Sequence, residues 1–308
     1  MFRGGRQTVR GGRMAPLLAL ATTVALAGCG LSTAPGTGAS STVEVVAADN
    51  FWGSIAGQVG GSRVHVTSLV VNPDTDPHVY EPKPEDARRI AQARYVIANG
   101  AGYDPWVVKL MNANPVVGRR ALLVGALLGR KEGDNPHFWY SPEYVDRVVD
   151  RITEDLKKID PADVEYFDRQ NVAYKTQGLK AYRDTIEVIR QKYAGAPVGA
   201  TESIFVYLAA SLGLQLVTPP EYMKAISEGA DPSAADKATV DRQIVQGRIR
   251  VLVFNAQNTT PDVNAYVDKA RAHGIPVIAV TEMLTPTKAS FQDWQTGQLR
   301  NVLDALGG

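Results

Sequence analysis

The stretch VEVVAADNFWGSIAGQVGGSRVHVTSLV, residues 43–70, places a helical pattern between two apolar runs. Residues 43–48 and 64–70 are rich in β-branched side chains and short enough for strands, whereas residues 50–60 have the length of a helix. Strands that alternate with helices form a parallel sheet whose two faces are both covered. This stretch therefore predicts an α/β protein.

The same alternation continues along the chain in two sets, separated by one long helical pattern. The predicted strands cover residues 43–48, 64–70, 95–99 and 121–124, and then 197–201, 214–218, 250–254 and 276–280. The predicted helices cover residues 50–60, 84–93, 103–112, 142–159, 203–212, 233–247, 261–273 and 291–306. Apolar residues recur at helical spacing from 161 to 193, which as one helix would measure about 50 Å, with Gly178 as its weak point.

These patterns predict two lobes, each a roughly four-stranded parallel sheet flanked by helices, joined by one long linking helix. The N-terminal lobe is expected at residues 43–160, the linking helix at 161–193 and the C-terminal lobe at 194–308. Ligands of such sheets bind outside the carboxyl ends of the strands, so the cleft between the lobes is the expected site.

The N-terminus has the pattern of an export signal. Residues 1–13 are basic, and residues 14–27 are apolar but too few to span a bilayer comfortably. The motif LAGC at residues 26–29 is similar to the lipobox of bacterial lipoproteins, and Cys29 is the only cysteine. We predict a lipoprotein signal peptide at residues 1–28, lipidation of Cys29 and a flexible tether at residues 29–42. An ordinary secretory signal with a chance cysteine is the alternative.

The composition suits a soluble globular protein and argues against a nucleic-acid partner. Of the 308 residues, 44% are hydrophobic and 21% are charged, and the formal net charge is +1. Four arginines lie in the predicted signal peptide, so the mature chain would carry about −3 and has no basic stripe.

Two of the four histidines lie in loops stiffened by proline. His78 is in DPHVYEP after the second predicted strand, and His137 is in NPHFWYSP after the fourth. Both therefore belong to the carboxyl edge of the first sheet, and neutral imidazole is a common ligand of zinc, manganese and iron. Two unrelated loop histidines are the alternative. His65 lies within a strand and His273 at a helix end before glycine, where neither is expected to bind metal.

The second lobe offers carboxylates at equivalent positions. Glu202 follows the strand PVGAT directly, and Glu282 follows the strand PVIAV after one threonine. The alternative for Glu202 is an acid that stabilises a helix start. Two neutral histidines with two carboxylates carry a charge of about −2, which balances a divalent cation. Oxygen ligands favour harder ions such as manganese, whereas nitrogen ligands keep zinc and iron possible.

No enzyme signature accompanies these residues. The sequence lacks HExxH, GxSxG, a P-loop and a GxGxxG after a strand, so we assign no catalytic residue and expect no enzyme. Two histidines with a carboxylate also occur in non-haem iron oxygenases, but a lipid anchor and two lobes fit that class poorly.

Over residues 43–308 the chain resembles the metal-binding (zinc/manganese-type) solute-binding lipoproteins of bacterial ABC importers. The motifs that carry this resemblance are DPHVYEPKPEDARRIAQARYVIANGAGYDPW, NPHFWYSPEYVDRVVDRI, LKKIDPADVEYFDRQN, ESIFVYLAASLGL and GIPVIAVTE. The resemblance implies two lobes joined by a rigid helix, with an interlobe metal site. His78, His137 and Glu202 match the first three ligand positions, and Glu282 is the best match for the fourth. Asn255 is a weaker rival for a role in the cleft.

Two departures from the family's pattern bear on the metal. Zinc-scavenging members often have a histidine-rich loop before the second ligand, which residues 125–134 lack, and they commonly have histidine where this chain has Glu202. Both differences favour manganese. The family usually has aspartate where this chain has Ser141. This difference affects a contact that supports a ligand, and not a ligand itself.

The resemblance implies a monomeric receptor on the outer face of the bacterial cytoplasmic membrane. It would capture manganese or zinc and deliver the ion to an ABC permease, held to the membrane through the lipid on Cys29. The rival functions are an extracytoplasmic metalloenzyme and an adhesin-like lipoprotein that needs no metal.

Overall fold

Two parallel sheets with the same strand order frame the protein. The computed structural model describes residues 42–73, 75, 77 and 80–307, all within one compact unit. The first sheet has the order β2-β1-β3-β4 and contains β1 (Val43–Asp49), β2 (Val64–Val70), β3 (Tyr95–Ala98) and β4 (Arg120–Leu123). The second has the order β6-β5-β7-β8 and contains β5 (Pro197–Ala200), β6 (Gln215–Leu216), β7 (Val251–Asn255) and β8 (Val277–Val280). All six strand pairings are parallel, which confirms the predicted fold class.

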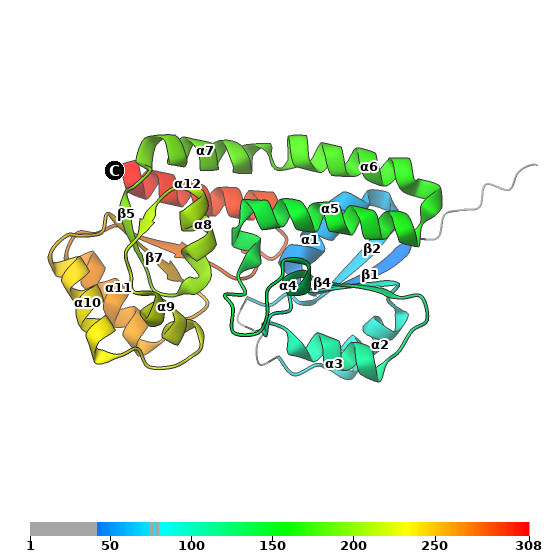
Figure 1. Cartoon of the computed structure of the whole chain (residues 1–308), viewed down its shortest axis with the longest axis horizontal. Helices are drawn as coiled ribbons and strands as arrows, with labels where there is room; N and C mark the ends of the chain where they lie inside the picture. Colours follow the sequence, from blue (N-terminus) through cyan, green and yellow to red (C-terminus); the bar gives the residue numbers. More distant parts are fainter. Residues whose placement is uncertain (1–41, 74, 76, 78–79, 308) are drawn as a thin grey trace, which may run out of the picture. The chain divides into compact units, whose positions relative to one another are not determined.

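Helices flank both sheets (Figure 1). In the first half they are α1 (Asn50–Gly60), α2 (Pro84–Gln92), α3 (Pro105–Ala113), α4 (Val124–Leu127) and α5 (Pro142–Ile159). In the second half they are α8 (Val206–Ser211), α9 (Pro220–Ser227), α10 (Ala234–Val245), α11 (Pro261–Ala272) and α12 (Phe291–Gly307). Short 3-10 turns lie at Gly61–Arg63, Phe138–Tyr140, Pro161–Asp163 and Ser203–Phe205. No helix in these described ranges is long and apolar enough to cross a bilayer.

The linking segment is helical but is not one regular helix. It consists of α6 (Val164–Ala173), a π-helical turn at Tyr174–Gly178 and α7 (Lys180–Tyr193). The Leu179 amide donates to the Tyr174 carbonyl at 2.8 Å, which closes the wider turn. A Cβ at Gly178 would lie 2.7 Å from the Tyr174 ring, so glycine lets the buried tyrosine pack closely. The predicted weak point at Gly178 is therefore where the helix changes its hydrogen-bond pattern.

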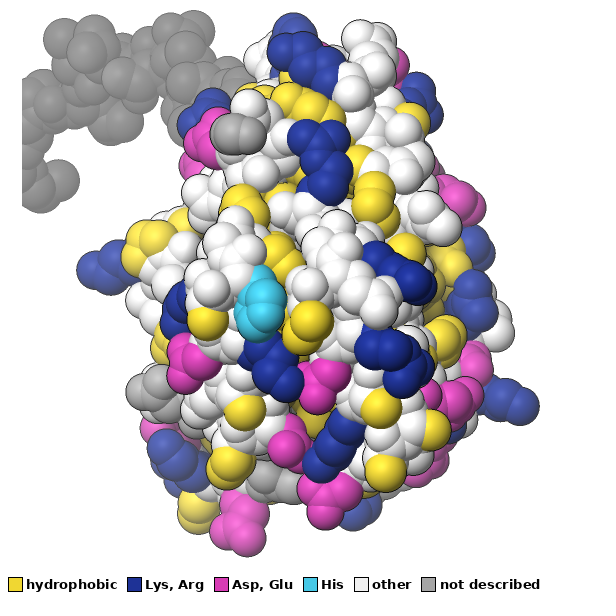
Figure 2. Space-filling model, turned by 90° about the vertical axis from the view of Figure 1, so that its left-hand side faces the viewer, with side chains coloured by type: hydrophobic (Ala, Val, Ile, Leu, Met, Phe, Trp, Pro, Cys, Tyr) yellow, Lys and Arg dark blue, Asp and Glu magenta, His cyan; other side chains and the backbone are white. Residues whose placement is uncertain are grey.

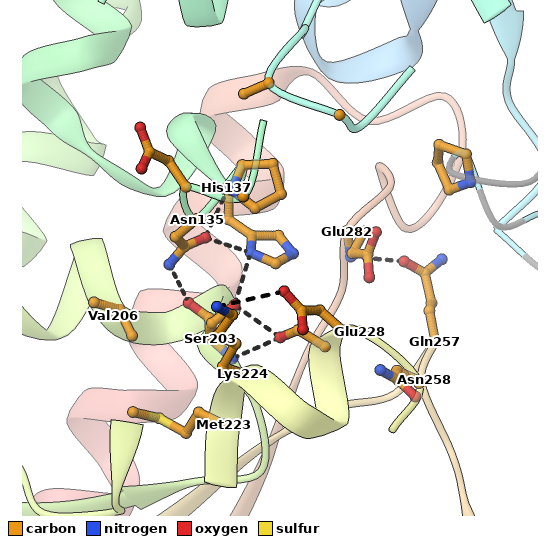
Figure 3. Close-up of a pocket in the computed structure, with 18 of the residues that line it drawn as sticks. Asn135, His137, Ser203, Val206, Met223, Lys224, Glu228, Gln257, Asn258 and Glu282 are labelled. Atoms are coloured by element: carbon orange, nitrogen blue, oxygen red, sulfur yellow. Dashed lines mark hydrogen bonds and ion pairs between the residues drawn. The ribbon is translucent and has the colours of Figure 1, made fainter. Parts of the chain in front are cut away.

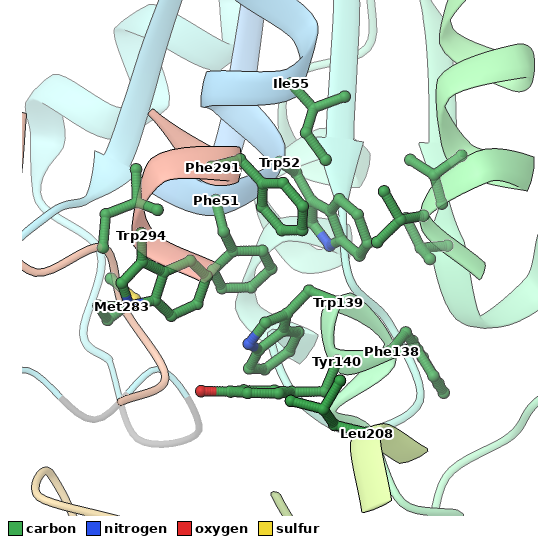
Figure 4. Close-up of a cluster of buried hydrophobic side chains, with 14 of the residues drawn as sticks. Phe51, Trp52, Ile55, Phe138, Trp139, Tyr140, Leu208, Met283, Phe291 and Trp294 are labelled. Atoms are coloured by element: carbon green, nitrogen blue, oxygen red, sulfur yellow. The ribbon is translucent and has the colours of Figure 1, made fainter. Parts of the chain in front are cut away.

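The core continues from the first lobe into the last helix. Phe51 of α1 stacks on Trp139 with ring centroids 4.1 Å apart, and Phe291 and Trp294 of α12 belong to the same buried cluster (Figure 4). The backbone amide of Phe291 donates to Ser54 Oγ at 2.9 Å. The chain's last helix thus packs on α7 and also against the first helix of the N-terminal lobe.

Several predicted boundaries were wrong, for local reasons. The helix expected from residue 103 begins at Pro105, because the Asp104 carboxylate instead accepts the backbone amides of Asn99 and Gly100 at 2.6 and 2.7 Å. The edge strand expected at 214–218 shortens to β6, and α9 was not predicted at all.

The surface of one end of the molecule is electrically mixed. Basic and acidic side chains alternate across the face in Figure 2, and no continuous basic area covers it.

Candidate metal site

Three potential metal ligands from different parts of the chain meet at the carboxyl ends of the strands. His137 lies in the connection that follows β4 and α4, Glu202 follows β5, and Glu282 follows β8. One ligand atom from each lies within 4.8 Å of the others. The site is thus built from both sheets, as expected for parallel strands whose carboxyl edges face each other.

A cavity of about 900 Å³ reaches this cluster, and both lobes line it. Ala101, Gly102 and His137 line it from the first lobe, and Ser203, Met223 and Gln257 from the second. Figure 3 shows the His137 ring and the Glu282 carboxylate facing this cavity. Since a water molecule occupies about 30 Å³, the cavity is large enough for a hydrated ion beside His137 and Glu282.

His137 is buried, and its ring orientation is fixed. The residue is only 2% exposed, and its Nδ1 lies 2.7 Å from Asn135 Oδ1. The Asn135 amide nitrogen donates to the Ser203 carbonyl at 2.8 Å, so its oxygen is the atom that faces the imidazole. Nδ1 therefore faces an acceptor oxygen, and in the neutral tautomer that donates from Nδ1 the ring lone pair lies on Nε2. This is the arrangement that a neutral imidazole needs to bind a metal.

Glu202 is turned toward the site and not toward the helix start. It is 1% exposed and precedes a 3-10 turn, but its side chain makes no capping hydrogen bond there. Instead Oε1 accepts from Asn255 Nδ2 at 2.8 Å and Oε2 accepts from Asn258 Nδ2 at 2.9 Å. The structure therefore does not support the helix-start alternative for this residue.

Glu282 is held by residues of both lobes. Its Oε1 accepts from Asn255 Nδ2 at 2.8 Å, and its Oε2 accepts from the Tyr103 hydroxyl at 2.9 Å. Burial first, and then the charge of Glu282, raise the pKa of Tyr103 well above its ordinary value. The phenol therefore stays protonated and remains a donor across the physiological pH range.

Negative charge is concentrated around the cluster. At 4.8 Å and an effective dielectric constant of about 20, two carboxylate charges repel by about 3 to 4 kcal/mol. Burial, followed by the charges of Asp104 and Glu282, raises the pKa of Asp49 well above its ordinary value. Neither carboxyl oxygen of Asp49 has a hydrogen-bond partner within the described part of the chain. A cation at the site would offset this repulsion.

The other predicted residues fall into two groups. His78 and Cys29 lie outside the described residues, as do the predicted signal peptide and nearly all of the tether. His65 is exposed and pairs with Glu44 at 2.8 Å, and His273 ends α11 with its ring against the Lys269 carbonyl. Neither of these two histidines belongs to the three-residue cluster.

The profile of the family described as "ZnuA: Zinc-uptake complex component A periplasmic" matches residues 45–305. The chain belongs to this ZnuA family. The resemblance inferred from the sequence motifs is thereby confirmed.

The chain is also similar to proteins whose names refer to zinc, manganese or metal. The zinc-binding lipoprotein AdcA of Streptococcus pneumoniae is 28% identical over 220 residues, which cover 64% of this chain and 42% of AdcA. This chain therefore spans less than half the length of that relative. The metal ABC transporter substrate-binding lipoprotein FimA of Streptococcus parasanguinis is 24% identical over 285 residues, 87% of this chain and 88% of FimA.

A solved structure supports the fold. The Mn-bound periplasmic metal-binding protein from Candidatus Liberibacter asiaticus superposes with a TM-score of 0.70 at 18% identity. The match covers 86% of this chain and 99% of that structure, so the two proteins share the same fold.

Sequence reasoning missed several neighbours of the ligands. Tyr103 and Asn258 each donate to a carboxylate, and Gln257 Oε1 accepts the backbone amide of Glu282 at 2.6 Å. The position of Gln257 and Asn258 just after Asn255 was the available signal. Ser141 caps α5 by accepting from the Tyr144 amide.

Proposed function

We propose that this protein is the extracytoplasmic metal receptor of an ABC importer, and that it captures manganese or zinc in the interlobe cleft. The observation that carries the proposal is the convergence of His137, Glu202 and Glu282 within 4.8 Å. His78, which follows β2 in the sequence, is the proposed fourth ligand. No bond is made or broken in this function, so the ligands serve binding alone.

The charge of the cavity supports capture of a cation. The described lining residues include five acidic side chains, Glu132, Asp134, Glu221, Glu228 and Glu282, against one basic side chain, Lys224. A cleft lined by one sign of charge raises the local concentration of the opposite ion. Anionic or neutral solutes would gain nothing from this lining.

The ligand chemistry favours manganese among the ions that the site can hold. Two carboxylates with imidazole suit manganese, and the absence of cysteine from the described cluster removes the softest ligand type. In solution zinc binds most such sites more tightly, so the ion carried in the cell depends on geometry and supply.

The proposed delivery step follows from the way the lobes are joined. The segment α6–α7 links them, and α12 is hydrogen-bonded to α1 through Phe291 and Ser54. Wide hinge opening would break these contacts. We therefore assign release to movement of the ligand loops when the protein docks on its permease. The lipid on Cys29 would hold the monomeric receptor at the membrane.

A ligand deletion with a matched control tests the site. His137→Ala and Glu202→Ala should each weaken manganese and zinc binding by at least about 100-fold, which exceeds the effect of residues that only orient ligands. His65→Ala, at an exposed strand position that does not line the cavity, should bind like the parent within a few-fold. Binding is measured by competition titration, and metal content by analysis of protein from its native host. Parental affinity in both ligand variants would refute the assignment.

A further inference from the structure

Asn255 lies between the two carboxylates and donates to both. It ends β7, the strand between β5 and β8 in the second sheet, and it is fully buried. One amide nitrogen lies 2.8 Å from Glu202 Oε1 and 2.8 Å from Glu282 Oε1. The amide therefore uses both of its hydrogens on the two acids.

The orientation of this amide is fixed by the backbone. Asn255 Oδ1 accepts the Gln257 backbone amide at 2.9 Å, so the side chain cannot rotate its oxygen toward the acids without losing that bond. An aspartate here would have the same shape and could keep the Gln257 bond, but it would have no hydrogen to donate. A neutral amide can therefore donate to both carboxylates, whereas an aspartate at this position would repel them.

The geometry of the amide also sets the spacing of the acids. Two hydrogens on one planar nitrogen point about 120° apart, which holds the two accepting oxygens about 5 Å from each other. Asn258, by contrast, divides its amide hydrogens between Glu202 Oε2 and the Ile226 carbonyl. Asn255 is therefore the residue that joins the two acids through one donor atom.

We infer that Asn255 is a specificity-determining positioning residue, which holds Glu202 and Glu282 as a pair and thereby favours manganese over zinc. This inference rests on the proposed function. Manganese prefers several oxygen ligands, so it needs both carboxylates in place. Zinc accepts nitrogen ligands and fewer partners, so it tolerates the loss of one oxygen better.

The test compares Asn255→Ala with Asn258→Ala. Asn255→Ala should weaken manganese binding by about 10- to 100-fold, the range for residues that orient ligands, and zinc binding by clearly less. The ratio of the two dissociation constants should therefore shift about tenfold toward zinc. Asn258→Ala removes one donor from one acid and does not separate the pair, so it should leave this ratio near the parental value. A purely structural role would weaken both metals equally.

A second pair of variants tests the same point in metal-free protein. The new carboxylate in Asn255→Asp would face two carboxylates, and that in Asn258→Asp would face one. Asn255→Asp should therefore melt several degrees lower than Asn258→Asp. The inference is overturned if Asn255→Ala keeps the parental metal ratio within twofold, or if Asn255→Asp melts no lower than Asn258→Asp. If the parent protein binds neither metal, the proposed function itself is refuted. If the parent binds metal but Asn255→Ala keeps the parental ratio of the manganese and zinc dissociation constants, the inference alone is refuted.

Discussion

Tyr103→Phe removes one oxygen atom from the contact between the lobes. The ring is fully buried, and its hydroxyl donates to Glu282 Oε2 at 2.9 Å, so phenylalanine keeps the packing and loses this hydrogen bond. A hydrogen bond to a charged group contributes about 1.5 to 3 kcal/mol. Because Glu282 is only partly buried and water can replace the phenol in part, we expect a loss of about 1.5 to 2 kcal/mol.

In a protein of this size each kcal/mol changes the melting temperature by about 2 to 4 °C. Differential scanning calorimetry of the metal-free variant should therefore show a decrease of about 3 to 8 °C. The metal dissociation constant should rise by about tenfold, because Glu282 loses a donor that orients it.

Tyr182→Phe is the matched control for this prediction. Tyr182 is also fully buried, but its hydroxyl has no hydrogen-bond partner within the described part of the chain. Its replacement should leave the melting temperature unchanged or raise it slightly. If Tyr103→Phe behaves like Tyr182→Phe in both assays, the hydrogen bond between the lobes does not stabilise the site and the argument fails.

Three further changes test the surroundings. Asp49→Asn should stabilise the metal-free protein at neutral pH by about 1 to 3 kcal/mol. Because the pKa of Asp49 is raised in the folded protein, the parental free energy of unfolding should fall as the pH rises from the ordinary value of 3.8 toward the folded-state pKa. In urea titrations, the free energy of unfolding of Asp49→Asn should lack this pH dependence. Asp155→Ala should cost about 3 kcal/mol in the same assay, because fully buried Asp155 accepts from Arg120. Gly178→Ala should lower stability by about 1 to 3 kcal/mol by pushing Tyr174 aside, although alanine favours helices; a more stable variant would disprove the tight contact.

The sequence predicted the sheets well because buried parallel strands have a simple signature. Seven of the eight strands lie within about one residue of the predicted ranges, and each is a short apolar run. Helix α9 was not predicted, although Pro220 occupies its first turn, where proline is tolerated. The π-helical turn depends on how the Tyr174 ring packs, and no local sequence pattern predicts that packing.

The three clustered residues were expected from their places after strands, whereas the residues that hydrogen-bond to them were not. Glu202 and Glu282 were located because each follows a strand of the same sheet, and parallel strands bring such positions together. Tyr103 was not found, because its role exists only once the two lobes are packed against each other. His78 as a ligand and the exact limits of the lobes remain predictions.

The docking of α12 on α1 has a consequence for synthesis. Leu284 donates its amide to Asn50 Oδ1 at 3.1 Å, and Gln292 pairs with Gln58, so residues more than two hundred positions apart complete one structure. The face of α1 that carries Ser54 and Gln58 therefore lacks its partner until α12 has been synthesised. A chain that stops short of α12 would leave this face of α1 open to proteases.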